Sequence, residues 1–368
     1  MDTFAFIIHP IDPKKDVSRK FPLLGKVLSE NQINFFSTFF PPLYISEIEG
    51  VTSAATGKQI KGWFLACPYT PKRMLELPEK VVYKKIIQTG QMAEKLGAQI
   101  LGLGAFTSVV GDAGITIARE LDVPVTTGDS YTVFLAVEAL RQAALAMDIH
   151  FESATTAVVG ATGSIGRVCA ELLSQQTGEV YLVGRRSEAL EVLREQLQLG
   201  ARARLHTSTS MDVLRHAQLI LTVTSSLHDV IRPEDLQSGA VVCDVARPRD
   251  ASAMVAAARN DILVIDGGMV DVPGPVDFHF NFGFPSGKSY ACMAETMALA
   301  LEGRFEDYTL GKQLTAERVN EIARIAGKHG FRLSGFRSFE KAVTSEQIES
   351  VRQARRSKTA ARNNYGGA

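Results

Sequence analysis

The strongest constraint on the fold of this 368-residue chain is a set of three glycines directly after an apolar segment near its middle. Residues 155–159 have the composition of a buried strand, and a helical stretch follows over residues 163–176. Between them, Gly160, Gly163 and Gly166 have the spacing of a phosphate-binding turn. The first glycine permits a tight turn, the second lets a pyrophosphate approach the backbone, and the third lets the helix lie close to the strand. The sequence therefore predicts a dinucleotide-binding turn here.

Short apolar strands alternate with helices after this turn, which is typical of a doubly wound parallel sheet. The further strands are expected at residues 179–184, 219–223, 240–244 and 262–265, and a helix is expected at residues 187–199. We therefore predict an α/β fold in which a Rossmann-like domain covers residues 151–285.

The flanking segments indicate an N-terminal α/β substrate domain over residues 1–150, C-terminal helices within 286–350, and an unfolded basic tail over 351–368. The expected strands are residues 4–9, a pair at 43–49 and 59–67, and then 100–103 and 123–127; the expected helices are 72–96, with Pro78 as a candidate interruption, 131–147, 290–301 and 315–329. The strands at 100–103 and 123–127 end in polar, glycine-containing turns. Such turns face the substrate in open α/β sheets, although tight turns without a ligand have the same composition.

The second strand of the nucleotide domain ends in Gly184, Arg185 and Arg186, with no acidic residue to bind the ribose hydroxyls of NAD. Two arginines at this place favour the extra phosphate of NADP, so the predicted cofactor is NADPH. The residues expected to bind it are Gly160, Thr162, Gly163, Ser164, Ile165, Arg185, Arg186, Val223, Thr224, Ser225, Gly267 and Gly268.

Charge and cysteine content exclude several classes of function. The 40 basic and 40 acidic residues cancel, so no global field favours nucleic acid. The cysteines lack the spacing of a zinc site or a disulfide framework, which favours a cytoplasmic protein without a metal. No apolar run is long enough to span a bilayer, so we expect no integral membrane association.

Cys292 is the candidate catalytic nucleophile. It follows Lys288 and Ser289, where Ser289 is the expected N-cap, so Cys292 falls in the first turn of the helix at 290–301. A helix N-terminus and a nearby lysine both lower the pKa of a thiol. The alternative is a buried structural cysteine, the role expected for Cys169 and Cys243, and Cys67 is a lesser candidate nucleophile.

Several segments together resemble the long-chain acyl-[acyl-carrier-protein] reductases of cyanobacteria, over most of the chain up to about residue 335. These segments are residues 103–108, 126–132, 160–166, 290–303 and 328–331. The resemblance implies that Cys292 is acylated, that NADPH donates the hydride, and that acyl carrier protein or coenzyme A delivers a fatty acyl group. It also implies an aldehyde-consuming partner, such as an aldehyde-deformylating oxygenase of hydrocarbon biosynthesis.

The chain departs from that pattern at residues 271–288, in the tail beyond Ser350, and at Asp129, Ser130 and Tyr131, where the family has Asn-Thr-His. These differences fall on the expected substrate side and leave acyl length and carrier preference open.

The residues and the resemblance together predict an NADP-dependent acyl thioester reductase that forms a thioester on Cys292 and releases a fatty aldehyde. Candidate proton donors are Lys288, Tyr290, Glu295 and His279, and the aromatic residues Phe35, Phe36, Phe39 and Phe40 are either core residues or the lining of an acyl tunnel. Three alternatives remain: a shikimate-dehydrogenase-like NADP-dependent dehydrogenase of a small alcohol or keto acid with a structural Cys292, a reductase resembling glutamyl-tRNA reductase, and a nucleotide-binding module without turnover.

Overall fold

The protein is described by a computed structural model that covers residues 1–226, 230–246, 249–251, 253–339 and 341–365. The chain forms two compact units. Unit 1 comprises Met1–Tyr131 and Val270–Ser334, and unit 2 comprises Thr132–Met269 and Gly335–Ala368. The segment that carries Cys292 thus belongs to the same unit as the N-terminal residues. The first boundary lies within helix α8 (Asp129–Ala146), about 20 residues before the one expected at residue 150.

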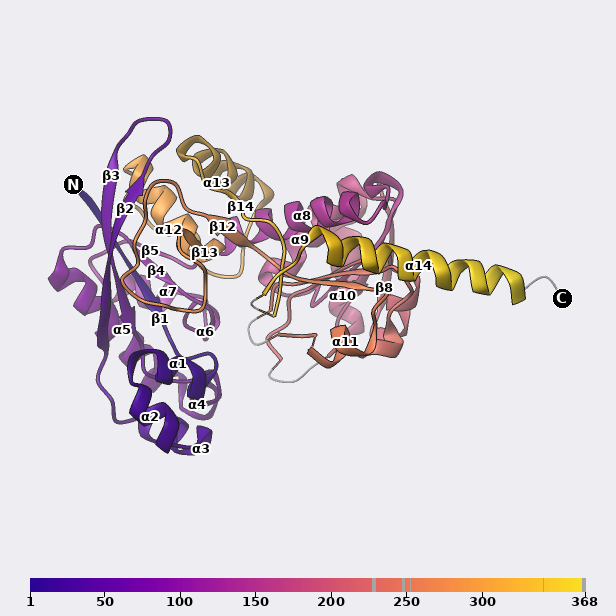
Figure 1. The fold of residues 1–368 in the computed structure, drawn as a ribbon. Helices are drawn as coiled ribbons and strands as arrows, with labels where there is room; N and C mark the ends of the chain where they lie inside the picture. The colour runs from indigo at the N-terminus through magenta and orange to yellow at the C-terminus, as the bar shows by residue number, and fades with distance from the viewer. Residues whose placement is uncertain (227–229, 247–248, 252, 340, 366–368) are drawn as a thin grey trace. The chain divides into compact units, whose positions relative to one another are not determined.

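Unit 1 contains a five-stranded sheet with the order β2-β3-β1-β4-β5 (Figure 1). The strands are β1 (Asp2–Ile8), β2 (Leu43–Thr52), β3 (Gln59–Ala66), β4 (Leu101–Leu103) and β5 (Val125–Thr126). β2 and β3 form the antiparallel pair that the sequence predicts, while β3, β1, β4 and β5 run parallel. The carboxyl ends of β1, β4 and β5 therefore meet at one edge of the sheet.

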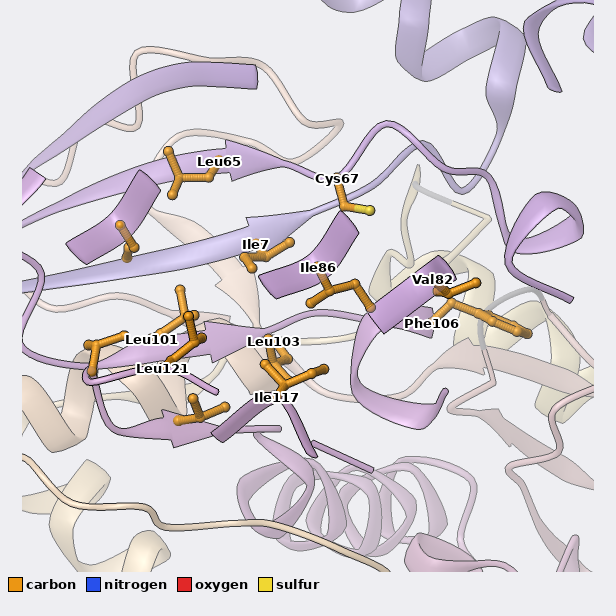
Figure 2. Close-up of a cluster of buried hydrophobic side chains, with 14 of the residues drawn as sticks. Ile7, Leu65, Cys67, Val82, Ile86, Leu101, Leu103, Phe106, Ile117 and Leu121 are labelled. Carbon is orange, nitrogen blue, oxygen red and sulfur yellow. The ribbon is translucent and has the colours of Figure 1, made fainter. Parts of the chain in front are cut away.

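Helices cover both faces of this sheet. Figure 2 shows one face, where Ile7, Leu101 and Leu103 pack against Ile86 of α5 (Glu79–Leu96) and Ile117 of α7 (Ile115–Arg119). The intervening residue Gly102 faces the other way, because side chains alternate along a strand. Helix α12 (Ala291–Glu302) packs on that second face, and α13 (Ala316–His329) packs against α12.

Proline places several breaks in unit 1. The helix expected over residues 72–96 is instead two helices, α4 (Pro71–Glu76) and α5, because Pro78 cannot donate a helical hydrogen bond. Unit 1 also contains three short helices that were not predicted from the sequence, α1 (Pro13–Lys20), α2 (Pro22–Val27) and α3 (Glu30–Ser37). The remaining elements of this unit are α6 (Phe106–Val109) and the three-stranded sheet of β12 (Met269–Asp271), β13 (Lys288–Tyr290) and β14 (Arg332–Leu333).

Unit 2 contains the predicted doubly wound sheet, with six parallel strands in the order β11-β10-β9-β6-β7-β8. The strands are β6 (Thr155–Val159), β7 (Glu179–Val183), β8 (Arg204–Ser208), β9 (Leu219–Thr222), β10 (Val241–Asp244) and β11 (Leu263–Asp266), and the helices include α9 (Ser164–Gln176), α10 (Ser187–Gln198) and α11 (Ala253–Ala258). Of the six strands of this sheet, only β8 was not anticipated, because an edge strand with no fully buried residue lacks an apolar pattern. The short helix α11 was not predicted from the sequence either.

The basic tail is helical in the structure, contrary to the prediction of an unfolded segment from residue 351. Helix α14 spans Ser345–Tyr365 and packs on unit 2. Arg355 donates a hydrogen bond to the Met147 carbonyl oxygen (3.0 Å), and Arg352 pairs with Asp148. Charge composition alone did not reveal these contacts with the end of α8. No helix in the described ranges is long and apolar enough to cross a bilayer.

Candidate active site

The carboxyl edge of the unit 1 sheet gathers polar residues around the start of α12. His9 follows β1, the residues 104–108 follow β4, and Thr127, Gly128 and Asp129 follow β5. The buried His9 accepts a hydrogen bond at Nε2 from the Phe106 backbone (2.9 Å), and burial lowers its pKa to about 4. His9 is thus neutral at physiological pH and fixes the turn after β4. Sequence reasoning did not single it out, although its place directly after a buried strand was a usable signal.

Two glycines let α12 lie unusually close to the strands and turns beneath it. A Cβ atom added to Gly102 in β4 would lie 2.2 Å from Oγ1 of Thr296, and one added to Gly128 would lie 2.3 Å from both Cα and Cβ of Cys292. Gly128 also has a φ of +76°, which side chains of L-residues rarely adopt. The turn after β5 and the first turn of α12 are therefore in direct contact at Cys292.

Cys292 is the second residue of α12, as the predicted position in the first helical turn requires. It is half-buried, whereas Cys67, Cys169 and Cys243 are fully buried. The N-cap is Tyr290 and not Ser289, because Ser289 lies in β13, whose pairing extends the chain up to Tyr290. A reagent can thus reach Cys292 more readily than any other thiol of the chain.

The expected low pKa of this thiol is not found. Burial raises the pKa of Cys292 to about 12, the negative charge of Asp129 contributes in the same direction, and a hydrogen bond with the Met293 backbone opposes them. Lys288, the cation expected nearby, pairs instead with Asp271 (2.5 Å). The helix N-terminus therefore stabilises the thiolate of Cys292 by less than burial destabilises it.

Asp129 is a second ionisable residue of this site, after His9, that sequence reasoning missed. It is only 5% exposed, and burial together with the charge of Glu295 raises its pKa from about 3.8 to about 7. Its Oδ2 atom and Oγ1 of Thr127 have no hydrogen-bond partner among the described residues. An acidic residue in a glycine turn at a strand end was the available signal, and the prediction used only the turn.

Glu295, a predicted candidate proton donor, is fully buried and holds the site together. Its Oε1 accepts hydrogen bonds from the hydroxyls of Thr126 (2.5 Å) and Thr309 (2.7 Å), and its Oε2 accepts one from the Tyr131 backbone (2.8 Å). Burial raises its pKa. With three donors already bound, Glu295 fixes both sides of the turn that contacts Cys292.

The other candidates lie in different surroundings. Tyr290 packs against Phe284, with ring centroids 4.4 Å apart, and His279 is exposed beside Glu49 and Asp277. The four phenylalanines proposed for a core or an acyl tunnel are neither buried nor enclosed. Their exposed fractions are 54% for Phe35, 42% for Phe36, 69% for Phe39 and 44% for Phe40.

In unit 2, the turn between β6 and α9 contains three glycines. At the first and the third, an added side chain would collide with the backbone. Gly160 has a φ of +86°, and a Cβ atom there would lie 2.6 Å from the Val223 carbonyl oxygen. A Cβ atom at Gly166 would lie 2.2 Å from the Gly160 carbonyl oxygen. Gly163 is the N-cap of α9 and, as a glycine, has no side chain to form a capping hydrogen bond. A phosphate can approach the backbone here, next to Thr162, Ser164 and Ile165.

The other predicted cofactor residues also follow strands of the unit 2 sheet. Arg185 and Arg186 follow β7, are exposed, and form no side-chain ion pair or hydrogen bond with the described residues. Val223, Thr224 and Ser225 follow β9, where the buried Asp250 accepts a hydrogen bond from the Thr224 backbone (2.8 Å). Gly267 and Gly268 follow β11, and a Cβ atom at Gly267 would lie 2.7 Å from Val245. An open glycine turn and two unpaired arginines fit a dinucleotide with an extra phosphate.

Comparisons with known proteins agree with this arrangement. The profile of the shikimate/quinate 5-dehydrogenase family matches residues 141–266. The aminotransferase PigE of Serratia sp. is 32% identical over 365 residues, which cover 95% of this chain and 42% of that protein. The long-chain acyl-[acyl-carrier-protein] reductase of Synechococcus elongatus is 29% identical over 345 residues, which cover 89% of this chain and 98% of that protein. The chain thus spans less than half the length of the first relative and nearly all of the second.

The fold, the nucleotide turn and these matches define an α/β protein with a Rossmann-like domain that binds NADP(H). The similarity to the cyanobacterial acyl-[acyl-carrier-protein] reductase covers 89% of this chain and so extends over both units.

Proposed function

We propose that the protein reduces a long-chain fatty acyl thioester, carried by acyl carrier protein or coenzyme A, to a fatty aldehyde through a thioester on Cys292. The single observation that carries the proposal is the half-buried Cys292, in the first turn of α12 and in direct contact with Gly128. The similarity to the Synechococcus reductase over nearly the full length of both chains supports it.

The residues of unit 1 account for the thioester exchange. Sγ of Cys292 forms a bond to the acyl carbon, and the bond between that carbon and the carrier sulfur breaks, so the carrier leaves as a thiol with the proton that Cys292 gives up. After reduction of the acyl carbon, its oxygen re-forms the carbonyl, the bond to Sγ breaks with its electron pair on sulfur, and the aldehyde leaves. The thiolate of Cys292 then takes a proton from water. The first backbone N–H groups of a helix have no intrahelical partner, and those at the start of α12 would stabilise an oxyanion next to Cys292.

In this proposal, unit 2 binds the cofactor. The glycine turn from Gly160 to Gly166 would hold the pyrophosphate of NADPH, and Arg185 with Arg186 would hold the phosphate on its ribose. When bound, NADPH supplies the hydride for the reduction of the acyl carbon.

The experiment is detection of hexadecanal from palmitoyl coenzyme A and NADPH, with wild-type protein, Cys292→Ala and the matched variant Cys67→Ala. We expect aldehyde from wild type and Cys67→Ala, and none from Cys292→Ala. Cys67 is a suitable control because it is a buried core residue of the same unit. Equal aldehyde formation by Cys292→Ala would refute the proposed route.

A second candidate function has support from one observation, the match of residues 141–266 to shikimate/quinate 5-dehydrogenases. That match covers a part of the chain that lies wholly in unit 2, so it concerns the nucleotide domain and not the Cys292 site. A dehydrogenase of a small alcohol or keto acid would need no thiol. It would oxidise its substrate with NADP at the same rate after the Cys292→Ala substitution.

A further inference from the structure

Helix α3 of unit 1 turns phenylalanine side chains toward solvent. Phe35 and Phe36 lie on α3, Phe39 and Phe40 directly follow it, and all four are exposed. The rings gather at one place, because the centroid of the Phe35 ring lies 5.5 Å from that of Phe36 and 5.6 Å from that of Phe39. Contiguous exposed apolar groups are uncommon on soluble proteins and generally mark a surface that binds a partner.

The buried side of α3 is largely polar. Ile33, Asn34 and Ser37 are the buried residues of this helix. The Asn34 side chain donates a hydrogen bond to Glu76 of α4 (3.2 Å) and accepts one from the Thr70 hydroxyl, and the Ser37 hydroxyl donates to the Asn34 carbonyl oxygen (2.7 Å). These bonds hold α3 on unit 1 without the phenylalanine rings. The fold therefore does not explain why the exposed side of α3 is aromatic.

Helix α2 extends this apolar surface. Leu23 and Val27 are 78% and 79% exposed, and Leu24 is exposed between them on the same side of the helix. Gly25 faces the other way, where an added Cβ atom would lie 1.8 Å from Oγ of Ser18 in α1. Helix α2 is thus packed on α1, and α1 packs on α3. We call the exposed apolar side chains of residues 23–27 and 35–40 the apolar face.

Basic residues accompany the apolar face. Residues 13–40 contain five basic and two acidic residues, although the whole chain is neutral. Lys14, Lys20 and Lys26 are exposed, and neither Lys14 nor Lys26 forms an ion pair or a hydrogen bond with the described residues. Apolar side chains next to lysines match an anionic lipid surface, in which acyl chains lie below headgroup phosphates. A protein partner fits less well, because protein interfaces are depleted in lysine.

Helices α1, α2 and α3 lie at the edge of the unit 1 sheet that also holds the Cys292 site. They connect the carboxyl end of β1 to the start of the antiparallel strand β2, and both of these strand ends lie at that edge (Figure 1). Arg19 and Lys20 of α1 donate hydrogen bonds to the carbonyl oxygens of Phe282 (3.1 Å) and Ile45 (2.7 Å). These bonds fix the helices on the body of unit 1.

We propose that the apolar face docks unit 1 on an anionic membrane surface. The phenylalanine and leucine side chains enter the boundary between headgroups and acyl chains, and the lysines bind lipid phosphates. This inference goes beyond the proposed function and does not rest on it, because docking needs neither a thiol nor NADPH. If the proposed function holds, the membrane would also take up the fatty aldehyde, whose apolar chain favours lipid over water.

The test is sedimentation of the full chain with vesicles, either of phosphatidylcholine alone or of phosphatidylcholine and phosphatidylglycerol in equal parts. We expect binding to the mixed vesicles that weakens as salt screens the lysines, and little binding to the neutral ones. The double substitution Phe35→Ala and Phe39→Ala should weaken binding about 10- to 100-fold. The control is Leu145→Ala with Leu199→Ala, since both leucines are exposed residues of unit 2. It should bind as wild type does.

A charge reversal tests the lysines separately. Lys26→Glu should weaken binding to the mixed vesicles about 5- to 30-fold, because a lysine near an anionic surface is replaced by a repelled carboxylate. Lys95→Glu is the matched control. Lys26 and Lys95 each lie in the last turn of a helix of unit 1, but Lys95 ends α5, which leads to the start of β4 at the opposite edge of the sheet. Lys95→Glu should bind as wild type does.

Three results would overturn the inference. The first is no binding of wild type to the mixed vesicles, and the second is unchanged binding of the double phenylalanine variant. The third is a dimer in light scattering without vesicles that the double phenylalanine variant lacks, which would make a second copy of this chain the occupant of the apolar face. None of these measurements uses an acyl substrate, so a failure of the proposed function leaves each of them unchanged.

Discussion

Gly128 turns the chain after β5 with a φ of +76° and leaves no room for a Cβ atom beside Cys292. We expect Gly128→Ala to lose about 1 kcal/mol to backbone strain and a further 1–3 kcal/mol to the contact with Cys292. We also expect it to slow acylation of Cys292, because α12 must shift. Gly97→Ala is the matched control, since Gly97 has a φ of +82° but nothing within 4 Å of an added Cβ atom. Urea unfolding of both variants tests this, and equal losses would contradict the close contact at Gly128.

Asp129, in the same turn, should make the free energy of unfolding depend on pH. The pKa of Asp129 is about 7 in the folded protein and near 3.8 when unfolded, so the folded state binds one more proton between these values. Stability is therefore lost as pH rises from about 4 to about 7, by at most about 4–5 kcal/mol. In Asp129→Asn this loss is absent. The difference in unfolding free energy between variant and wild type, measured in urea, should grow across that range, and a constant difference would show that Asp129 titrates normally.

At the scale of elements, Glu295 on α12 binds three donors from β5, the start of α8 and the segment at Thr309. We expect Glu295→Ala to lower the unfolding free energy by about 3 kcal/mol or more, because buried donors left without an acceptor each cost about 1–3 kcal/mol. Glu306→Ala is the control. Glu306 is an exposed partner of Arg304, and its loss should cost no more than about 1 kcal/mol. Similar losses for the two variants would mean that Glu295 does not anchor α12.

The two arginines in the turn between β7 and α10 predict a preference for NADPH over NADH. We expect the double substitution Arg185→Ala and Arg186→Ala to weaken NADPH binding about 10- to 100-fold, since charged hydrogen bonds contribute about 1.5–3 kcal/mol. Binding of NADH should change little. Arg194→Ala is the control, because Arg194 lies on α10 but pairs with Glu191 (2.8 Å). Calorimetric titration checks this, and an equal loss for both cofactors would place the arginines away from the phosphate.

Much of the element pattern was predictable because local sequence determines it. The apolar segment at β6, the glycine turn and α9 follow one another as expected, and α12 and α13 begin within two residues of the prediction. The misses have non-local causes. The N-cap at Tyr290 depends on the pairing of β13, and the raised pKa of Cys292 depends on burial by distant segments. Asp129 became a residue of the site only when the fold brought β5 and α12 together.

At the scale of the whole molecule, the proposed chemistry divides between two units. Cys292 and Gly128, which it contacts, belong to unit 1 although they lie far apart in sequence, and the predicted NADP(H) residues all belong to unit 2. The chain therefore leaves unit 1 after Tyr131, builds the nucleotide domain, and returns to unit 1 at Val270, ahead of α12. Acylation should thus need only unit 1 chemistry, whereas discharge of the acyl group should need a functional nucleotide site.

The most direct test is a single-turnover mass measurement with palmitoyl coenzyme A and, separately, with palmitoyl acyl carrier protein, first without and then with NADPH. We predict a palmitoyl adduct on the peptide that contains Cys292, lost as aldehyde after NADPH is added. The double arginine variant should form the same adduct but discharge it more slowly, and Cys292→Ala should form none. No adduct on wild type from either carrier, or the same adduct on Cys292→Ala, would contradict the account.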